Sequence, residues 1–349
     1  MKAEELVVIA ERDNASDIHL ICGLPPKYRV AGRLTDMCSG ALTDSDCDEI
    51  ARELAGEDYD KLMRVGELDK AANIAGRRIR INLFRQMEHT SAALRLLSDT
   101  IPDLSSLGLP PAVERLTELQ RGMVIVTGET GSGKSTTLAA MIDRINHTRA
   151  EHVITLEDPV EYIYKPDKSI FNQREIGRDT ESYANGLRAA LREDPDIILV
   201  GEMRDLDTIE TALTAAETGH LVFATLHTGS AAESIDRIVD VFSEARQKQI
   251  RMQLSMTLKA VISQRLLPTA DGKSRVAACE LMIVNYAIRN LIREGKTPQI
   301  ESTISTTASE GAITMDNALL RLYRDRKISR DTALLAAHDA EYVKKSLLY

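Results

Sequence analysis

The sequence predicts a two-domain α/β protein, in which a smaller α+β domain precedes a larger domain built on a parallel sheet. Its 349 residues are enough for two domains. From about residue 112, short β-branched runs alternate with helical segments, as in a parallel sheet covered by helices on both faces. Residues 99–111 are rich in Ser, Pro and Gly, which is typical of an interdomain linker. We therefore expect domains at residues 1–98 and 112–349.

The first domain combines helical patches with short strands. Strands are expected at residues 27–30 and 33–34, on either side of Gly32. Residues 77–84 (RRIRINLF) alternate polar and apolar side chains, which indicates a strand with one buried face. Residues 92–97 are another strand candidate. Together these elements predict a compact domain with an amphipathic sheet.

Arginines gather near the end of this first domain, at Arg77, Arg78, Arg80, Arg85 and Arg95. An arginine that reaches a phosphate in another domain or subunit can stabilise the charge of a transition state. The alternative interpretation is a solvated face of a strand. Composition alone leaves both interpretations open.

The second domain opens with a phosphate-binding motif, because residues 128–135 (GETGSGKS) fit the pattern G-x-x-x-x-G-K-[ST]. An apolar run at 123–127 precedes the loop and a helix over 136–142 follows it, so the loop lies between a buried strand and a helix N-terminus. The residues expected to bind a nucleoside triphosphate are Gly128, Thr130, Gly131, Ser132, Gly133, Lys134, Ser135 and Thr136. Lys134 supplies charge for the β- and γ-phosphates, and the Ser135 hydroxyl can ligate Mg²⁺.

The remaining elements of the second domain follow the same alternation. Strands are expected at residues 153–156, 197–200 and 221–225, and helices at 183–193 and 205–218. Residues from about 231 to the end are predicted to be mostly helical, with one strand candidate at 276–283. Ligands of such sheets bind beyond the carboxyl ends of the strands.

Acidic residues follow two of these strands. Glu202 comes just after the run at 197–200, where nucleotide hydrolases keep a carboxylate that orients Mg²⁺. Gly201 replaces the usual aspartate before it, so Glu202 is expected to act on the metal through water. Glu157, Asp158 and Glu161 follow the run at 153–156, and one of them could activate the attacking water. For Glu202 the alternative is an ordinary surface carboxylate. For Glu157, Asp158 and Glu161 the alternative is an exposed acidic turn.

Two histidines, His220 and His227, bracket the strand at 221–225. His227 falls at its carboxyl end, where an imidazole can donate to the γ-phosphate. The alternative is a structural histidine with satisfied hydrogen bonds.

Composition excludes several function classes. With 44 basic and 53 acidic residues the net charge is −9, and aromatic residues are only 4%, which argues against a nucleic-acid-binding protein. There is no apolar run long enough for a membrane span, and the N-terminus does not resemble a signal peptide. Cys22, Cys38, Cys47 and Cys279 form no C-x-x-C pair, so we expect reduced thiols of a cytosolic protein rather than disulfides or zinc ligands.

Long motifs show a resemblance to a known family. They are ASDIHL (15–20), GETGSGKSTTLAAMID (128–143), ITLEDPVEY (154–162), LREDPDIILVGEMRDLDTIETALTAAETGHLVFATLHT (191–228) and AIRNLIREGK (287–296). The chain thus resembles the secretion ATPases of the type II/type IV pilus superfamily, and within it the branch that retracts pili. The resemblance implies an amino-terminal PAS-like domain, a RecA-like ATPase domain and a homo-hexameric ring that uses ATP and Mg²⁺.

The resemblance also implies roles for individual residues. Lys134 and Ser135 would bind phosphate and Mg²⁺, Glu161 would be the catalytic base, and Glu202 the carboxylate near the metal. His220 and His227 would be the paired histidines of the family, and Arg80 and Arg95 would reach ATP within the ring.

The implied function is an ATP-hydrolysing motor that disassembles pilin and so powers pilus retraction and twitching motility. Its implied partner is a platform protein of the inner membrane, and its implied location is the cytoplasmic face of that membrane, without direct binding of nucleic acid. A pilus-assembly or type II secretion ATPase is one alternative, but those enzymes often carry paired C-x-x-C motifs, and only Cys279 lies in that region here. The others are a nucleotide-binding regulator without hydrolysis and a RecA-like nucleic-acid motor.

Overall fold

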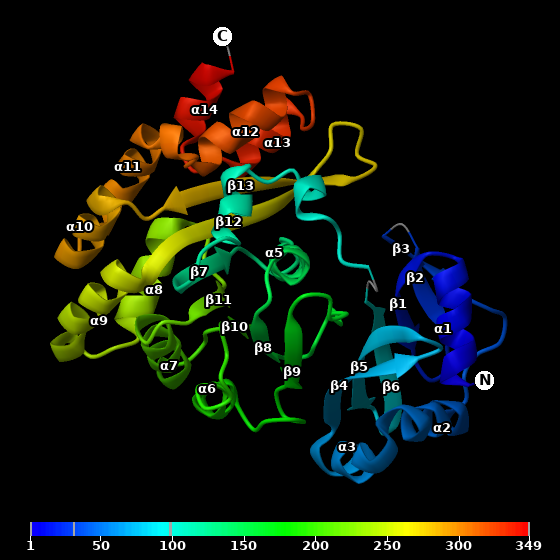
Figure 1. The fold of residues 1–349 in the computed structure, drawn as a ribbon. Helices are drawn as coiled ribbons and strands as arrows, with labels where there is room; N and C mark the ends of the chain where they lie inside the picture. The colour runs from blue at the N-terminus through cyan, green and yellow to red at the C-terminus, as the bar shows by residue number, and fades with distance from the viewer. Residues whose placement is uncertain (1, 31, 98–99, 348–349) are drawn as a thin grey trace. The chain divides into compact units, whose positions relative to one another are not determined.

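The computed structural model describes residues 2–30, 32–97 and 100–347, which form two compact units (Figure 1). The first unit consists of Met1–Thr100 together with Pro159–Ile163. The second consists of Ile101–Asp158 and Tyr164–Tyr349. The expected boundary at residues 98 and 99 lies outside the described residues. The short segment Pro159–Ile163 falls within the sequence range expected for the second domain, yet it packs with the first unit.

The first unit is a six-stranded antiparallel sheet in the order β3-β2-β1-β6-β5-β4, with helices packed on it. Its elements are α1 (Ala3–Arg12), β1 (Ala15–Leu20), β2 (Lys27–Val30), β3 (Arg33–Asp36), α2 (Asp44–Ala55), α3 (Tyr59–Val65), β4 (Glu67–Ile74), β5 (Arg77–Gln86) and β6 (His89–Leu96). The alternation predicted for β5 is confirmed, because Ile79, Ile81 and Leu83 are fully buried while Arg78 and Arg80 are only half-buried on the opposite face.

The second unit is a seven-stranded sheet in the order β13-β12-β7-β11-β10-β8-β9, parallel except for β13. Its strands are β7 (Gly122–Thr127), β8 (His152–Glu157), β9 (Ile170–Glu175), β10 (Ile197–Val200), β11 (Leu221–Leu226), β12 (Leu258–Pro268) and β13 (Arg275–Ile283). Its helices are α4 (Ala112–Leu116), α5 (Lys134–Thr148), α6 (Tyr183–Ala190), α7 (Leu206–Glu217), α8 (Ala231–Asp240), α9 (Glu244–Thr257), α10 (Tyr286–Glu294), α11 (Ile300–Thr306), α12 (Met315–Arg324), α13 (Arg330–Ala336) and α14 (Ala340–Ser346). This is the RecA-like α/β arrangement that the sequence predicts.

The helices cover both faces of this parallel sheet, as Figure 1 shows. Met123 and Ile125 of β7 join a core that includes side chains of α7, α8 and α9, while α5 packs against β7 from the other side. In β7, β10 and β11 every residue is buried. Fully buried strands lack the polar–apolar alternation of a half-buried strand, which is why they appear in the sequence as continuous apolar runs.

Among the described strands, β1 and β4 of the first unit and β9 and β12 of the second were not expected. β12 lies where the sequence favours helix, because Leu, Lys, Gln and Arg dominate it and no turn separates it from α9. Parallel pairing with β7 and antiparallel pairing with β13 override that preference. The carboxyl half of the chain is therefore less helical than predicted.

In the described part of the chain, none of the helices has both the length and the apolar character needed to cross a membrane.

Candidate active site

The phosphate-binding loop connects the carboxyl end of β7 to α5, and its glycines are required by space and backbone angles. Gly128 has a φ of 142°, and a Cβ there would lie 2.3 Å from the Gln264 carbonyl oxygen and 2.5 Å from Ser132 Oγ. Gly133, with a φ of 93°, precedes the first helical residue of α5. Only glycine adopts both conformations without a clash.

The loop presents hydrogen-bonding groups toward the site. Lys134 Nζ donates to the carbonyl oxygens of Gly128 and Glu129 at 2.8 and 2.9 Å, so its ammonium group lies over the loop. The first N–H groups of any α-helix lack intrahelical acceptors and attract anions. Three buried side-chain atoms around the loop, Thr127 Oγ1, Ser132 Oγ and Gln264 Oε1, have no hydrogen-bond partner among the described residues. Buried polar groups are rarely left unpaired, so this cluster is suited to a polar ligand.

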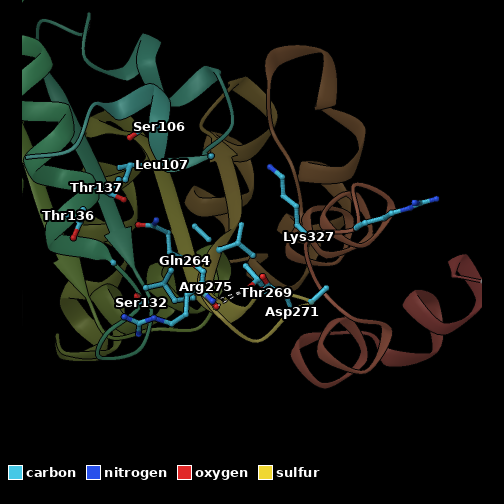
Figure 2. Close-up of a pocket in the computed structure, with 18 residues that line it drawn as sticks. Ser106, Leu107, Ser132, Thr136, Thr137, Gln264, Thr269, Asp271, Arg275 and Lys327 are labelled. Atoms are coloured by element: carbon cyan, nitrogen blue, oxygen red, sulfur yellow. Dashed lines mark hydrogen bonds between the residues drawn. The ribbon is translucent and has the colours of Figure 1, made fainter. Parts of the chain in front are cut away.

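A cavity of about 710 Å³ continues from the loop and is large enough for a nucleoside. Thr136 and Thr137 of α5 line it, and Ser106 and Leu107 lie nearby (Figure 2). Its other wall comes from the β12–β13 hairpin and the turn after α12, and includes Thr269, Asp271, Arg275 and Lys327. The segment expected to be only a linker thus supplies part of a ligand cavity.

Glu202 lies at the same carboxyl edge of the sheet, held by backbone bonds on both sides. Gly201 N donates to Leu156 O at 2.7 Å, and Met203 N donates to Thr225 O at 3.1 Å, so Glu202 projects between β8 and β11. Its Oε1 lies 2.7 Å from Arg204 Nε and 3.4 Å from His227 Nε2.

The charge of Glu202 is set by these neighbours. Partial burial by itself would raise the pKa of Glu202, but the Arg204 hydrogen bond and the positive groups of Arg204, His227 and Lys134 lower the pKa overall. Glu202 is therefore a carboxylate at neutral pH. The ionised carboxylate of Glu202 and the exposed hydroxyl of Ser135, the residue after Lys134, are both oxygen ligands, which Mg²⁺ prefers.

Gly201 stands before Glu202 at a position with little space for a side chain. A Cβ at this position would lie 3.0 Å from both Leu156 O and the Tyr183 hydroxyl oxygen. Burial raises the pKa of Tyr183, and the charges of Asp158, Glu202 and Glu157 raise it further. Tyr183 thus stays protonated and offers a neutral hydroxyl beside three carboxylates, a role that sequence reasoning missed.

The two histidines occupy opposite edges of the sheet. His227 follows the carboxyl end of β11, as expected, and its Nε2 lies 3.4 Å from Glu202 Oε1. His220 precedes β11, where its Nδ1 lies 2.9 Å from Ala215 O and 3.2 Å from Thr218 Oγ1. Since a strand rises about 3.3 Å per residue, the two rings are roughly 20 Å apart. The structure therefore does not support a catalytic role for His220 at this subunit's own phosphate-binding loop.

The remaining predicted site residues belong to the first unit. Arg80 donates to Asp69 Oδ2 at 2.7 Å, and Arg95 Nε donates to Asp17 Oδ1 at 2.9 Å. Glu161 lies in Pro159–Ile163, where Arg78 Nε donates to Val160 O at 3.2 Å. Glu157 and Asp158 belong to the second unit, so the acidic motif is divided between the two units.

Arg204 and Gln264 complete the site but were not singled out from the sequence. Arg204 lies inside the long motif at 191–228, which was the available signal for it. Gln264 lies in β12, a strand that local sequence preference does not indicate.

Comparisons with known proteins identify the family. Residues 70–336 match the family model described as type II/IV secretion system protein. The chain is 45% identical to the type IV pilus retractation ATPase PilT of Pseudomonas aeruginosa, over 95% of this chain and 97% of that protein. It is 50% identical to a twitching motility protein of Neisseria gonorrhoeae, over 81% of this chain and 75% of that protein.

A solved structure supports the same assignment. The crystal structure of the pilus retraction motor PilT with bound ADP superposes with a TM-score of 0.92, at 46% identity and with 99% of each chain covered. Sequence identity and fold agree over nearly the whole length, and the family model matches more than half of the chain. The chain belongs to the type II/IV secretion system family of ATPases.

Proposed function

We propose that this protein is an ATP-hydrolysing motor that works as a hexameric ring and powers type IV pilus retraction by disassembling pilin. The observation that carries the proposal is the placement of an ionised Glu202 beside the phosphate-binding loop at one edge of a parallel sheet. The assignment to the pilus-retraction branch of the family is supported by the 45% identity to a pilus retractation ATPase over almost the entire chain.

Nucleotide binding would use the groups described at the loop. The triphosphate lies against the backbone N–H groups and Lys134, and the nucleoside extends into the cavity beside Thr136 and Thr137. Ser132 Oγ and Gln264 Oε1 then gain hydrogen-bond partners. When bound, Mg²⁺ would neutralise charge on the phosphate oxygens, held by Ser135 directly and by Glu202 through water.

Hydrolysis would proceed by in-line attack of water on the γ-phosphorus. Glu161 accepts the proton of that water as the new P–O bond forms, and the bond to the β–γ bridging oxygen breaks. Lys134 and His227 face the charge that develops on the phosphoryl oxygens, and Arg80 and Arg95 reach it within the assembled ring. No covalent enzyme intermediate is needed.

Mechanical work would come from coupling nucleotide state to the position of the first unit. Ser106, Leu107 and Gly108 line the nucleotide cavity, and they lie in the second unit a few residues after its first residue, Ile101. A change from ATP to ADP would therefore act on the chain close to the point where it leaves the first unit. The ring would act on a platform protein of the inner membrane, at its cytoplasmic face.

Two measurements test this function. The purified chain should release phosphate from ATP, and hydrolysis should depend on Mg²⁺. Deletion of the gene in its native host should leave cells with excess surface pili and without twitching. Cells that lose their pili would indicate an assembly ATPase instead, and binding without phosphate release would indicate a regulator.

A further inference from the structure

Three different donor side chains meet on the first unit, far from one another in sequence. Cys22 follows β1, Asp44 is the first residue of α2, and His89 is the first residue of β6. One ligand atom from each, a thiol sulfur, a carboxylate oxygen and an imidazole nitrogen, lies within 4.8 Å of the other two. His89 Nδ1 and Asp44 Oδ1 are 2.6 Å apart. This cluster is separate from the residues that line the nucleotide cavity.

The local structure leaves Asp44 available for this contact. The start of α2 is capped by Thr43, whose hydroxyl accepts from Asp46 N, while Asp46 Oδ2 accepts from Thr43 N in return. This reciprocal arrangement satisfies the end of the helix without Asp44. A two-residue turn at Met87 and Glu88 closes the β5–β6 hairpin and places His89 opposite Gln86 at the end of the sheet. The three side chains are thus brought together by two different structural elements and a loop.

The chemistry of the three donors selects the kind of ion. Thiolate and imidazole together with one carboxylate are ligands typical of zinc, whereas Mg²⁺ and Ca²⁺ prefer oxygen ligands throughout. Zinc–sulfur and zinc–nitrogen distances place donors in a tetrahedral site about 3.3–3.8 Å apart. His89 Nδ1 and Asp44 Oδ1 must therefore open from 2.6 Å by about 0.7 Å, while the other two pairs, at most 4.8 Å apart, must close by about 1.5 Å at most. The Asp44 and His89 side chains are 65% and 44% exposed, so both can rotate to make these adjustments.

We propose that Cys22, Asp44 and His89 bind one Zn²⁺ ion per subunit, with water in the remaining position. Binding releases the thiol proton of Cys22 to solvent and replaces the hydrogen bond between Asp44 and His89. The ion would link the β1 exit, the start of α2 and the β5–β6 hairpin, and so stabilise the first unit. Spacing in the sequence could not reveal such a site, because the absence of C-x-x-C pairs argues against zinc.

The test uses the purified full-length chain, stripped of metal and kept under reducing conditions without nucleotide. Titration with Co²⁺ should saturate at one equivalent and give a cobalt–thiolate charge-transfer absorption, which Zn²⁺ then abolishes by displacement. Zn²⁺ should also raise the melting temperature. Cys22→Ser should lose the charge-transfer band, and His89→Gln should weaken binding at least about 10-fold, the smallest effect of disturbing a metal site's supporting residues.

Matched controls keep the result interpretable. Cys38→Ser removes another half-buried thiol of the same unit, and His147→Gln removes a histidine paired with Asp167 elsewhere in the chain. Both should bind Co²⁺ like the unmodified protein. Asp44→Asn changes an exposed side chain and should weaken binding while keeping the fold. The proposal is overturned if the unmodified chain binds neither ion at one equivalent, or if binding survives in both Cys22→Ser and His89→Gln, which would leave Asp44 and His89 as a surface ion pair only.

Discussion

Arg204 Nε lies 2.7 Å from Glu202 Oε1, so the carboxylate that ends β10 is ion-paired with a residue only two positions further along the chain. Glu202 is 17% exposed and Arg204 is 69% exposed. The carboxylate is therefore largely enclosed, while most of the Arg204 side chain is open to solvent. Arg204 is a candidate positioning residue, because it both orients Glu202 and keeps it ionised.

Replacing Arg204 with alanine should make hydrolysis more sensitive to acid. The folded-state pKa of Glu202 lies below its ordinary value, so its ionised form contributes fully at neutral pH and is lost as pH falls through that lowered pKa. Without Arg204 the pKa of Glu202 should rise. In a profile of kcat against pH, the acidic limb should then move to higher pH. Arg188→Ala, which breaks a surface ion pair with Asp207, is the control and should leave the profile in place. An unchanged acidic limb in Arg204→Ala would show that Glu202 is ionised by its other neighbours.

Lys134→Ala should abolish hydrolysis and weaken nucleotide binding, because it removes the charge that faces the β- and γ-phosphates. Binding of a fluorescent ATP analogue and release of phosphate are the two measurements. Lys248→Ala, at an exposed position of α9, should behave like the unmodified protein. Normal turnover in Lys134→Ala would mean that this loop is not the active site.

Glu161→Gln should separate binding from chemistry. The amide keeps the size of the side chain but cannot accept a proton, so we expect near-normal ATP affinity with hydrolysis reduced roughly 10²-fold or more. Glu157→Gln is the matched comparison within the same acidic motif. Its Oε1 accepts a hydrogen bond from Thr155 Oγ1 at 2.6 Å, which an amide oxygen can also accept. If Glu157→Gln is the more damaging change, the base is Glu157 and not Glu161.

Arg80→Ala should lower the ATPase activity of the ring while each subunit stays folded. Arg80 lies directly opposite Arg95 across β5 and β6 and pairs with Asp69 near the surface, so its loss should change stability by no more than about 0.5 kcal/mol. Thermal unfolding checks the stability, and steady-state phosphate release checks the activity.

Mixed rings reveal whether Arg80 acts across a subunit interface. Rings made only of Arg80→Ala or only of Lys134→Ala subunits should each have lowered or no activity, but a mixed ring pairs an intact loop with an intact arginine if the arginine serves a neighbouring subunit. Activity should then reappear on mixing. If ATPase activity is not recovered at any ratio of the two variants, Arg80 acts at the nucleotide site of its own subunit or has no role in catalysis.

The sequence predicted those features of the molecule that are formed by residues close together in the chain. The phosphate-binding loop is one, since a strand, two obligatory glycines, Lys134 and a helix follow one another within a few residues. The helix α10 is another, because its apolar residues Ile288, Leu291 and Ile292 are spaced three and four positions apart. Apolar residues at this spacing share one face of a helix, and here Ile288 and Ile292 are fully buried and Leu291 packs against the core.

The sequence by itself therefore determined the order of domains, the parallel sheet, the phosphate loop and the carboxylates that follow its strands. Only the tertiary structure decided what depends on pairing between distant segments. β12 is a strand because β7 and β13 flank it, and His220 lies at the far edge because β11 is parallel to β7. Cys22, Asp44 and His89 meet for the same reason. Local preferences are short-ranged and weak, whereas strand pairing and burial join residues that no sequence spacing connects.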